Sequence, residues 1–145
     1  MSIKGIRRFQ DERKLHKQPY SWENEVMNVL EEMLEAKGYD VPSKVRESFL
    51  RPIAQYIRSK AATNPAIIWK EPTVEEKVDS HGDQIVFNVG SIMKLGYEPS
   101  SVLDEVSREI NSRDGKIIKG KFEKFLPGDK GYNKPYKADF SKCKL

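Results

Sequence analysis

The sequence predicts an all-α fold, and three observations support that class. Apolar residues recur at helical spacing over four long stretches of the 145-residue chain. Cap and stop residues bound several of these stretches. The chain holds one cysteine and two histidines, so neither a disulfide framework nor a zinc finger explains the fold. A chain of this length forms one domain with a hydrophobic core of its own.

The first expected helix covers residues 22–37, and the second lies within residues 43–61. The first begins after Ser21, whose hydroxyl suits a cap, and ends before Gly38. In the second, Pro52 either kinks the helix or starts a new segment. Both stretches carry an apolar stripe, which indicates that each packs against another element.

Residues 63–72 indicate a linker before the third expected helix, 73–95. That helix begins with a capping box, in which Thr73 and Glu76 satisfy each other's free backbone donors. The fourth expected helix covers residues 101–113. These four helices make up the predicted all-α core.

The pattern changes after residue 113. The stretch KIIKGKFEKF could form a short hairpin around Gly120 or extended chain. The remaining residues are rich in Gly, Pro, Lys and aromatics and predict an extended, loop-rich tail. We expect Cys143 to be exposed, and Tyr136 and Phe140 either to stack on a nucleobase or to fold back over a helix.

Charge divides the chain into three parts. Residues 1–20 carry a net charge of +4, residues 114–145 carry +5 and residues 21–113 carry −5. We interpret them as a basic N-terminal arm, a basic C-terminal tail and a helical core, the tail and core belonging to one domain. An acidic middle is not the uniformly basic face of a DNA-binding domain, so nucleic acid is an unlikely partner. The pattern suits an enzyme acting on small polyanions, although solvated helix faces and solubilising arms would produce it too.

The sequence also predicts where the protein works. No apolar run approaches the roughly 18 residues of a membrane span. The first residues lack the apolar core of an export signal. We therefore expect a cytoplasmic protein without a membrane partner, in the host cytoplasm if a phage encodes it.

Two expected helices carry a narrow acidic row beside the apolar stripe. Glu32 and Glu35 lie about 60° apart on the first, and Glu76, Asp79 and Asp83 fall within an arc of about 60° on the third. No Lys or Arg stands four residues from these acids, as it normally does on a solvated face. Because clustered carboxylates repel one another, we expect cations between them. Oxygen ligands alone select Mg²⁺ or Mn²⁺ over zinc.

The acids also match a family signature. Glu31-Glu32-Met-Leu-Glu35, followed on a later helix by Glu76-Lys-Val-Asp79, resembles the E-x-x-E … E-x-x-D signature of the all-α nucleoside triphosphate pyrophosphohydrolases, the MazG-like superfamily. This resemblance implies a four-helix MazG-like fold completed by the extended tail.

Further features resemble the phage-type members of that superfamily. They are an Asp-initiated apolar stretch from Asp83, a Leu-Gly-Tyr-x-Pro turn, a helix ending in Glu-Ile-Asn-Ser-Arg, and the segments GKFEK and YKADFSKCKL. The resemblance covers roughly residues 21–145. The second acidic motif has two registers, Glu76 with Asp79 or Asp79 with Asp83. Asp83 precedes the apolar run that usually follows the motif aspartate, so we favour the second register with Glu76 accessory.

The resemblance implies a Mg²⁺-dependent enzyme, with Mn²⁺ as a substitute, that converts a (d)NTP and water to the (d)NMP and pyrophosphate and so controls a nucleotide pool. The metal ligands it implies are Glu32, Glu35, Asp79 and Asp83. A proton acceptor would be Glu31 or Glu76. The groups expected to hold the phosphates are Arg108, Asn111, Arg113, Lys116, Lys121 and Lys137.

Three alternatives stay open. Arg108 could pair with Asp104 or Glu105 in its own helix instead of binding phosphate. The chain could be a non-catalytic phage protein that binds nucleotides or nucleic acid. It could also be a nucleotide sensor without turnover.

The resemblance further implies a homo-oligomer, at least a dimer, because superfamily members build their helix bundle from two subunits.

Overall fold

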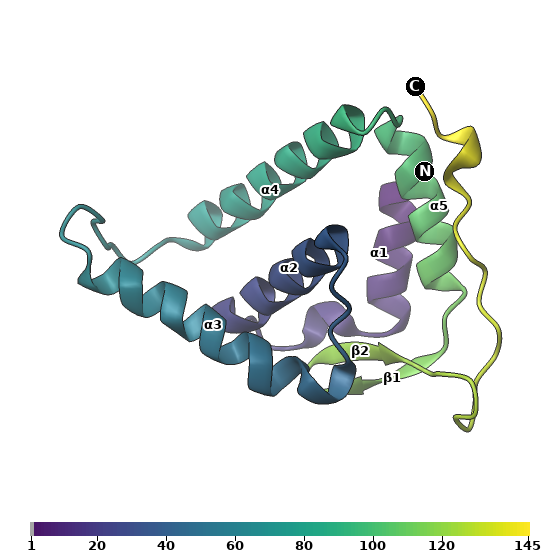
Figure 1. Cartoon of the computed structure of the whole chain (residues 1–145), viewed down its shortest axis with the longest axis horizontal. Coiled ribbons are helices and arrows are strands. Elements are labelled where there is room, and N and C mark those ends of the chain that lie inside the picture. The colour runs from purple at the N-terminus through teal and green to yellow at the C-terminus, as the bar shows by residue number, and fades with distance from the viewer. Residues whose placement is uncertain (1) are drawn as a thin grey trace. The chain divides into compact units, whose positions relative to one another are not determined.

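The computed structural model describes residues 2–145. Within that range the chain forms five α-helices and one two-stranded antiparallel sheet, joined by short 3₁₀ turns (Figure 1). The helices are α1 (Ser2–Glu12), α2 (Trp22–Lys37), α3 (Ser43–Thr63), α4 (Val74–Lys94) and α5 (Pro99–Asn111). The strands are β1 (Gly115–Ile118) and β2 (Lys121–Lys124). The mostly helical class expected from the sequence is confirmed, and the small sheet adds to it.

The chain divides into two compact units. One holds residues 19–71, with α2 and α3, and the other holds residues up to 18 together with 72–145. None of the helices over residues 2–145 combines the length and apolar character needed to cross a bilayer.

The local signals in the sequence fall where the helices begin and end. The Ser21 hydroxyl accepts a hydrogen bond from the Asn24 backbone N–H at the start of α2, and Gly38 ends that helix with a φ of 101°. Pro52 lies inside α3, which continues through it as one helix. The capping box of Thr73 and Glu76 forms at the start of α4.

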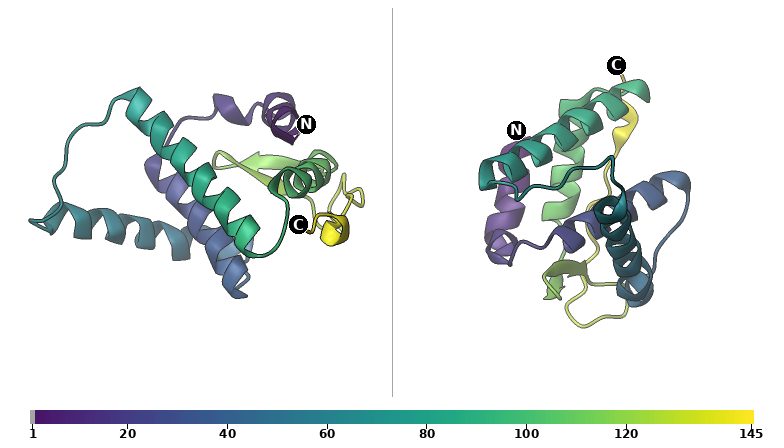
Figure 2. Two further views of the ribbon diagram at one scale, coloured as in Figure 1. Left: turned by 90° about the horizontal axis from the view of Figure 1, so that it is seen from above. Right: turned by 90° about the vertical axis from the view of Figure 1, so that its left-hand side faces the viewer.

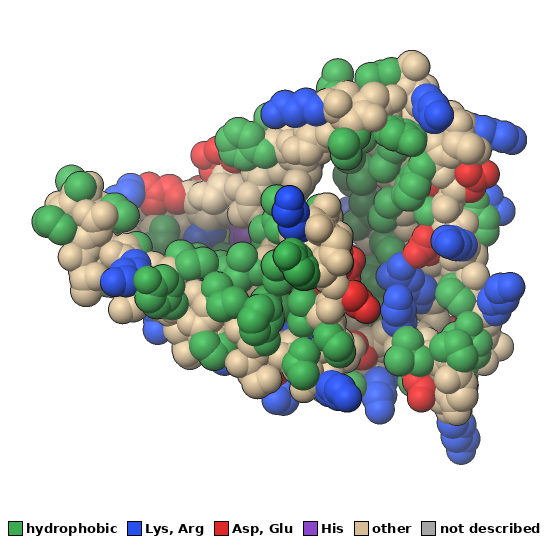
Figure 3. Space-filling model, viewed as in Figure 1, with side chains coloured by type: hydrophobic (Ala, Val, Ile, Leu, Met, Phe, Trp, Pro, Cys, Tyr) green, Lys and Arg blue, Asp and Glu red, His purple; other side chains and the backbone are tan. Residues whose placement is uncertain are grey.

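In the unit of residues 19–71, α2 and α3 pack as a helix pair. Its core contains Met27, Leu50 and Ala54, all fully buried. Five half-buried apolar side chains surround them: Val26, Leu30, Leu34, Val41 and Ile53. Hydrophobic side chains also gather on the outside of this pair, where Phe49 and Tyr56 are exposed (Figure 3).

In the other unit, α1 packs along α5, and the two views of Figure 2 show them side by side. Helix α1 was not predicted from the sequence, although Ile3, Ile6 and Phe9 recur every three residues in the basic arm. The helices approach closely at Gly5, where an added Cβ would lie 1.8 Å from the Ser107 Oγ. This packing over a long sequence separation holds α1 against the rest of the unit.

A cluster at the end of α1 fixes the hairpin. The Arg13 guanidinium carbon lies 4.3 Å from the Phe9 ring centroid and 5.1 Å from that of Phe122 on β2. Arg13 also donates to the Arg113 carbonyl over 2.7 Å. The hairpin turns at Lys119 and Gly120, both with positive φ, as a two-residue hairpin loop requires. Of the two alternatives for this stretch, the hairpin is the one that forms.

After β2 the chain turns at residues 127–131 and then continues without helix or strand to a short 3₁₀ turn at Phe140–Lys142. Its end returns to the α4–α5 junction, where the Glu98 N–H donates to the Cys143 carbonyl over 2.7 Å and Leu145 N–H donates to Gly96 over 3.0 Å. The expectation that Cys143 is exposed is wrong, since the residue is only 3% exposed. Its pairing with a segment 45 or more residues earlier in the chain places it inside, and no local pattern announces that pairing.

Candidate functional site

The three glutamates of α2 that the sequence predicts as site residues differ in burial. Glu31 is largely buried, and its Oε2 accepts a hydrogen bond from Arg46 Nε over 2.7 Å. Arg46 Nη2 donates to the Asn28 amide oxygen over 2.6 Å. Glu32 and Glu35 lie on the exposed side of the helix. A role for Glu31 as proton acceptor would therefore require it to leave a buried ion pair, whereas the Glu35 carboxylate forms no hydrogen bond or ion pair with any described residue.

The acidic row of α4 separates in the same way. The Glu76 carboxylate accepts from the Thr73 backbone N–H over 2.9 Å and so belongs to the helix cap. Asp79 and Asp83, one turn apart, are both exposed. Neither carboxylate forms a hydrogen bond or ion pair with residues 2–145. Of the three acids on this face, the two aspartates thus have carboxylates open to an external cation.

A complete metal site needs more ligands than either row supplies. Mg²⁺ takes six oxygen ligands in an octahedron, usually one or two carboxylates with waters and phosphate oxygens. Among residues 2–145, no cluster of three or more His, Cys, Asp or Glu side chains is placed to bind a metal ion. The two rows belong to different units, and the convergence of Glu32, Glu35, Asp79 and Asp83 stays a prediction. The chemistry of the donors, carboxylate oxygens alone, fits Mg²⁺ and Mn²⁺.

The basic residues expected to hold phosphate have different surroundings. The Arg108 guanidinium carbon lies over the Tyr136 ring, 3.8 Å from its centroid, and the group forms neither of the two intrahelical ion pairs considered for it with a described carboxylate. Arg113 forms an ion pair with Glu109. Lys116 on β1 and Lys137 in the tail are exposed, and Lys121 on β2 is half-buried.

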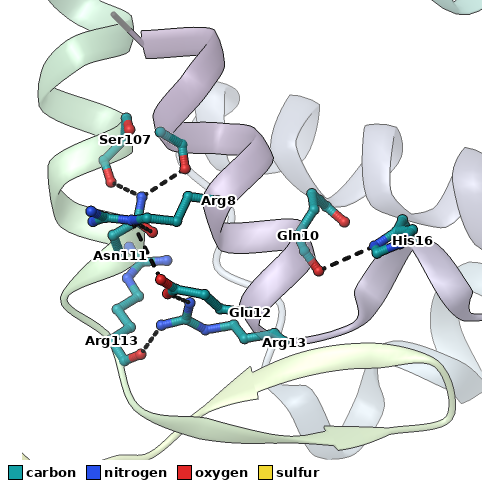
Figure 4. A network of polar contacts seen from close by, with 9 residues as sticks. Arg8, Gln10, Glu12, Arg13, His16, Ser107, Asn111 and Arg113 are labelled. Carbon is teal, nitrogen blue, oxygen red and sulfur yellow. Dashed lines mark hydrogen bonds and ion pairs between the residues drawn. The ribbon is translucent and has the colours of Figure 1, made fainter.

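Asn111 already has protein partners at both ends of its amide. Its Nδ2 donates to the carbonyls of Gly5, over 2.9 Å, and Ser107, over 2.8 Å. Its Oδ1 accepts from Arg8 Nε over 3.3 Å (Figure 4). Asn111 therefore joins α1 to α5 and orients Arg8.

The C-terminal tail docks on α5 through two glutamates. Glu105 Oε2 accepts from the Tyr136 hydroxyl over 2.6 Å and from the Asp139 N–H over 2.9 Å. Glu109 Oε2 accepts from the Ala138 N–H over 2.7 Å. Of the two alternatives for Tyr136, the structure shows folding back over a helix, because its ring and hydroxyl both contact α5.

These contacts shift the acidity of the groups involved. The Asp139 N–H, followed by the Tyr136 hydroxyl, lowers the pKa of Glu105 below its ordinary value of 4.5. Burial opposes ionisation of Glu109, but the Ala138 N–H and Arg113 outweigh it, so the pKa of that carboxyl is also lowered. The bond to Glu105 raises the pKa of the Tyr136 phenol. At neutral pH both glutamates are therefore charged and hold the tail.

Lys4 and Arg8 were not among the residues predicted from the sequence to bind a ligand. Both line a pocket between α1 and α5, together with the predicted phosphate groups Arg108 and Asn111. Two basic residues at i, i+4 in the N-terminal arm were the available signal, but it gains meaning only once residues 2–12 are a helix.

Comparison with protein-family models, with curated protein sequences and with solved structures finds no match to this chain.

Proposed function

We propose that this protein is a Mg²⁺-dependent nucleoside triphosphate pyrophosphohydrolase that converts a (d)NTP and water to the (d)NMP and pyrophosphate. The observation that carries the proposal is the state of three acids, Glu35 on α2 and Asp79 and Asp83 on α4. All three are exposed, and none forms an ion pair with a described residue. Carboxylates kept at helical spacing without a cationic partner repel one another unless a cation binds between them.

The residues of the chain divide the work in this proposal. Glu32, Glu35, Asp79 and Asp83 would hold Mg²⁺, which when bound neutralises charge on a triphosphate and activates water for attack. Basic side chains near the end of α5, with Arg108 oriented by Tyr136, would bind the outer phosphates. Glu31 and Glu76 support the two acidic rows, one through Arg46 and the other through the α4 cap.

We propose further that the protein works as a homo-oligomer, at least a dimer. The helix α4 has no buried residue. Its exposed apolar side chains are Val74, Val78, Ile85, Val86, Phe87 and Met93. A helix that is apolar on its exposed surface is stabilised when another helix covers it. A second subunit that covers α4 would complete a bundle around the acidic row.

Light scattering coupled to size exclusion tests the oligomer. At about 10 µM we expect at least twice the chain mass, and Phe87→Glu should shift the population toward the monomer. The exposed charge reversal Lys94→Glu, at the last residue of α4, controls for added negative charge. A monomeric mass for the unaltered chain would contradict the oligomer.

A product assay tests the activity. The protein is incubated with each (d)NTP and Mg²⁺, and products are separated by anion exchange; we expect the monophosphate and pyrophosphate. Glu35→Gln, Asp79→Asn and Asp83→Asn should each lower the rate by about 100-fold or more. Glu75→Gln, an exposed α4 acid outside the row, is the matched control and should keep the rate.

Two results would contradict the hydrolase. One is orthophosphate as the product, because it would place the cleaved bond elsewhere in the triphosphate. The other is a rate that survives all three acidic-row substitutions, because the carboxylates would then have no part in the reaction.

A further inference from the structure

A pocket of about 450 Å³ lies between α1 and α5, within one unit of the chain. Its volume falls in the range of roughly 300–1,000 Å³ typical of small-molecule sites. The lining residues are Lys4, Gly5, Arg8, Asp104, Ser107, Arg108 and Asn111. Three of them are cations and one is a carboxylate, so the pocket has a net positive lining.

The pocket exists because the two helices meet at a residue without a side chain. Gly5 lets α1 approach Ser107, which is buried on α5. Lys4 and Arg8 are four residues apart on α1, and Asp104 and Arg108 are four apart on α5. Residues at this spacing share a helix face, so four charged side chains converge on the helix crossing.

The arginines of the pocket are held in place by the protein. Asn111 accepts from Arg8 Nε and is itself fixed by two backbone carbonyls (Figure 4). The remaining contact of Arg8 is an exposed ion pair with Glu12 at 3.7 Å, which is weak at the surface. Arg108 lies over the Tyr136 ring. Both guanidinium groups are thus oriented while their terminal nitrogens form no hydrogen bond to a described residue.

The two remaining charged groups are open to a ligand. Within residues 2–145, neither the Lys4 ammonium nor the Asp104 carboxylate forms an ion pair or hydrogen bond. Asp104 stands on the same helix as Arg108 without pairing with it. A pocket of two oriented guanidinium groups, one ammonium and one carboxylate contains both donors for an anion and an acceptor for a hydroxyl group.

We propose that this pocket binds a sugar phosphate group, as found in a free sugar phosphate or in a nucleotide. Lys4, Arg8 and Arg108 hold the phosphoryl oxygens, because planar guanidinium groups match phosphate geometry and the ammonium adds charge. Asp104 accepts a hydrogen bond from a sugar hydroxyl. Arg108 is assigned to phosphate in both proposals, but binding here needs no divalent metal, so its test is separate from that of the hydrolase.

Isothermal titration calorimetry in 50 mM salt with EDTA tests the site on the full chain. The probes are ribose 5-phosphate, adenosine 5′-monophosphate, inorganic phosphate and ribose. We expect both phosphate esters to bind more tightly than inorganic phosphate, and ribose not to bind. The tighter ester identifies the source of the group, a free sugar phosphate or a nucleotide. EDTA removes divalent metal, so a failure here is distinct from a failure of the hydrolase.

Substitutions locate the binding. Lys4→Gln, which breaks no contact within the described residues, should weaken ester binding at least 5-fold, and Arg108→Gln at least 10-fold. Arg7→Gln is the matched control: it removes the same charge as a pocket substitution from an exposed pair with Asp11 on α1, and it should leave affinity within 2-fold. Asp104→Ala, which removes the acceptor, should remove the preference for the esters over inorganic phosphate.

Three results would overturn the proposal. They are no binding of either ester, equal affinity for the esters and inorganic phosphate, and equal losses from Lys4→Gln and Arg7→Gln. The last would mean that the overall positive charge of the helix, and not the pocket, attracts the anion. Circular dichroism spectra of the variants confirm that each keeps its helices.

Discussion

Helices α3 and α4 are both 21 residues long, yet one is partly buried and the other is not. α3 buries Arg46, Leu50 and Ala54 against α2, whereas α4 buries no residue. Both carry apolar residues at helical spacing, and α4 has the better N-terminal cap. The comparison shows that amphipathic spacing predicts a helix but does not identify its partner. α3 has a partner inside its unit, whereas the apolar side chains Ile85, Val86 and Phe87 of α4 are exposed.

The largest difference between α3 and α4 is expected in the stability lost when an apolar side chain is truncated. Leu50→Ala should cost about 2–5 kcal/mol of the free energy of unfolding, because it leaves a cavity in the core of α2 and α3. Ile85→Ala on α4, which is 58% exposed, should cost less than about 0.5 kcal/mol in dilute solution. Urea unfolding followed by circular dichroism measures both. Equal costs at submicromolar concentration would mean that α4 is already covered within one chain.

The buried ion pair of α3 provides the next largest effect. Arg46→Met should cost about 3 kcal/mol, because it strands the Glu31 carboxylate, whose side chain is 12% exposed, without its cation. Arg58→Met breaks a comparable contact to Glu23 from an arginine that is 65% exposed, and should cost about 0.5 kcal/mol or less. The double substitution Arg46→Met with Glu31→Leu should recover much of the loss. If it does not, packing of the Arg46 stem, and not the stranded charge, carries the effect.

Replacing a glycine by alanine should have a smaller effect on stability, and the effect should be opposite in sign at Gly82 and Gly5. At Gly82 in α4 an added Cβ would meet no atom within 4 Å, so Gly82→Ala should stabilise the helix by about 0.5–1 kcal/mol. At Gly5 the same atom would collide with Ser107, so Gly5→Ala should destabilise the contact between α1 and α5. Thermal unfolding measures both. A loss of stability in Gly82→Ala would show that a neighbour approaches α4 closely.

Acid should loosen the tail on α5. The pKa values of Glu105 and Glu109 are lowered in the folded chain. Their contribution is therefore complete above the ordinary value of 4.5 and is lost as the pH falls below it. The protection of the Ala138 and Asp139 amides against hydrogen exchange, taken relative to the intrinsic exchange rate at each pH, should fall below pH 4.5. Unchanged protection down to pH 3 would show that other contacts hold the tail.

The acidic rows illustrate how far residue spacing alone leads. It predicts that Glu32 and Glu35 share one face, as do Asp79 and Asp83, because a helix fixes the angle between residues three or four apart. It does not separate Glu31, which is buried against Arg46, from its exposed neighbour Glu32. That difference depends on a side chain 15 residues away on another helix.

By itself the sequence determined the bounds of α2, α3, α4 and α5 to within about two residues, the α4 cap and the open alternatives of the hairpin. These depend on residues a few positions apart, where capping, glycine geometry and helical periodicity act. Tertiary structure alone decided that α1 packs on α5, that Cys143 is buried and that Arg8 meets Asn111. Arg8 and Asn111 are 103 residues apart in the chain, and local periodicity holds no information on which distant surfaces complement each other.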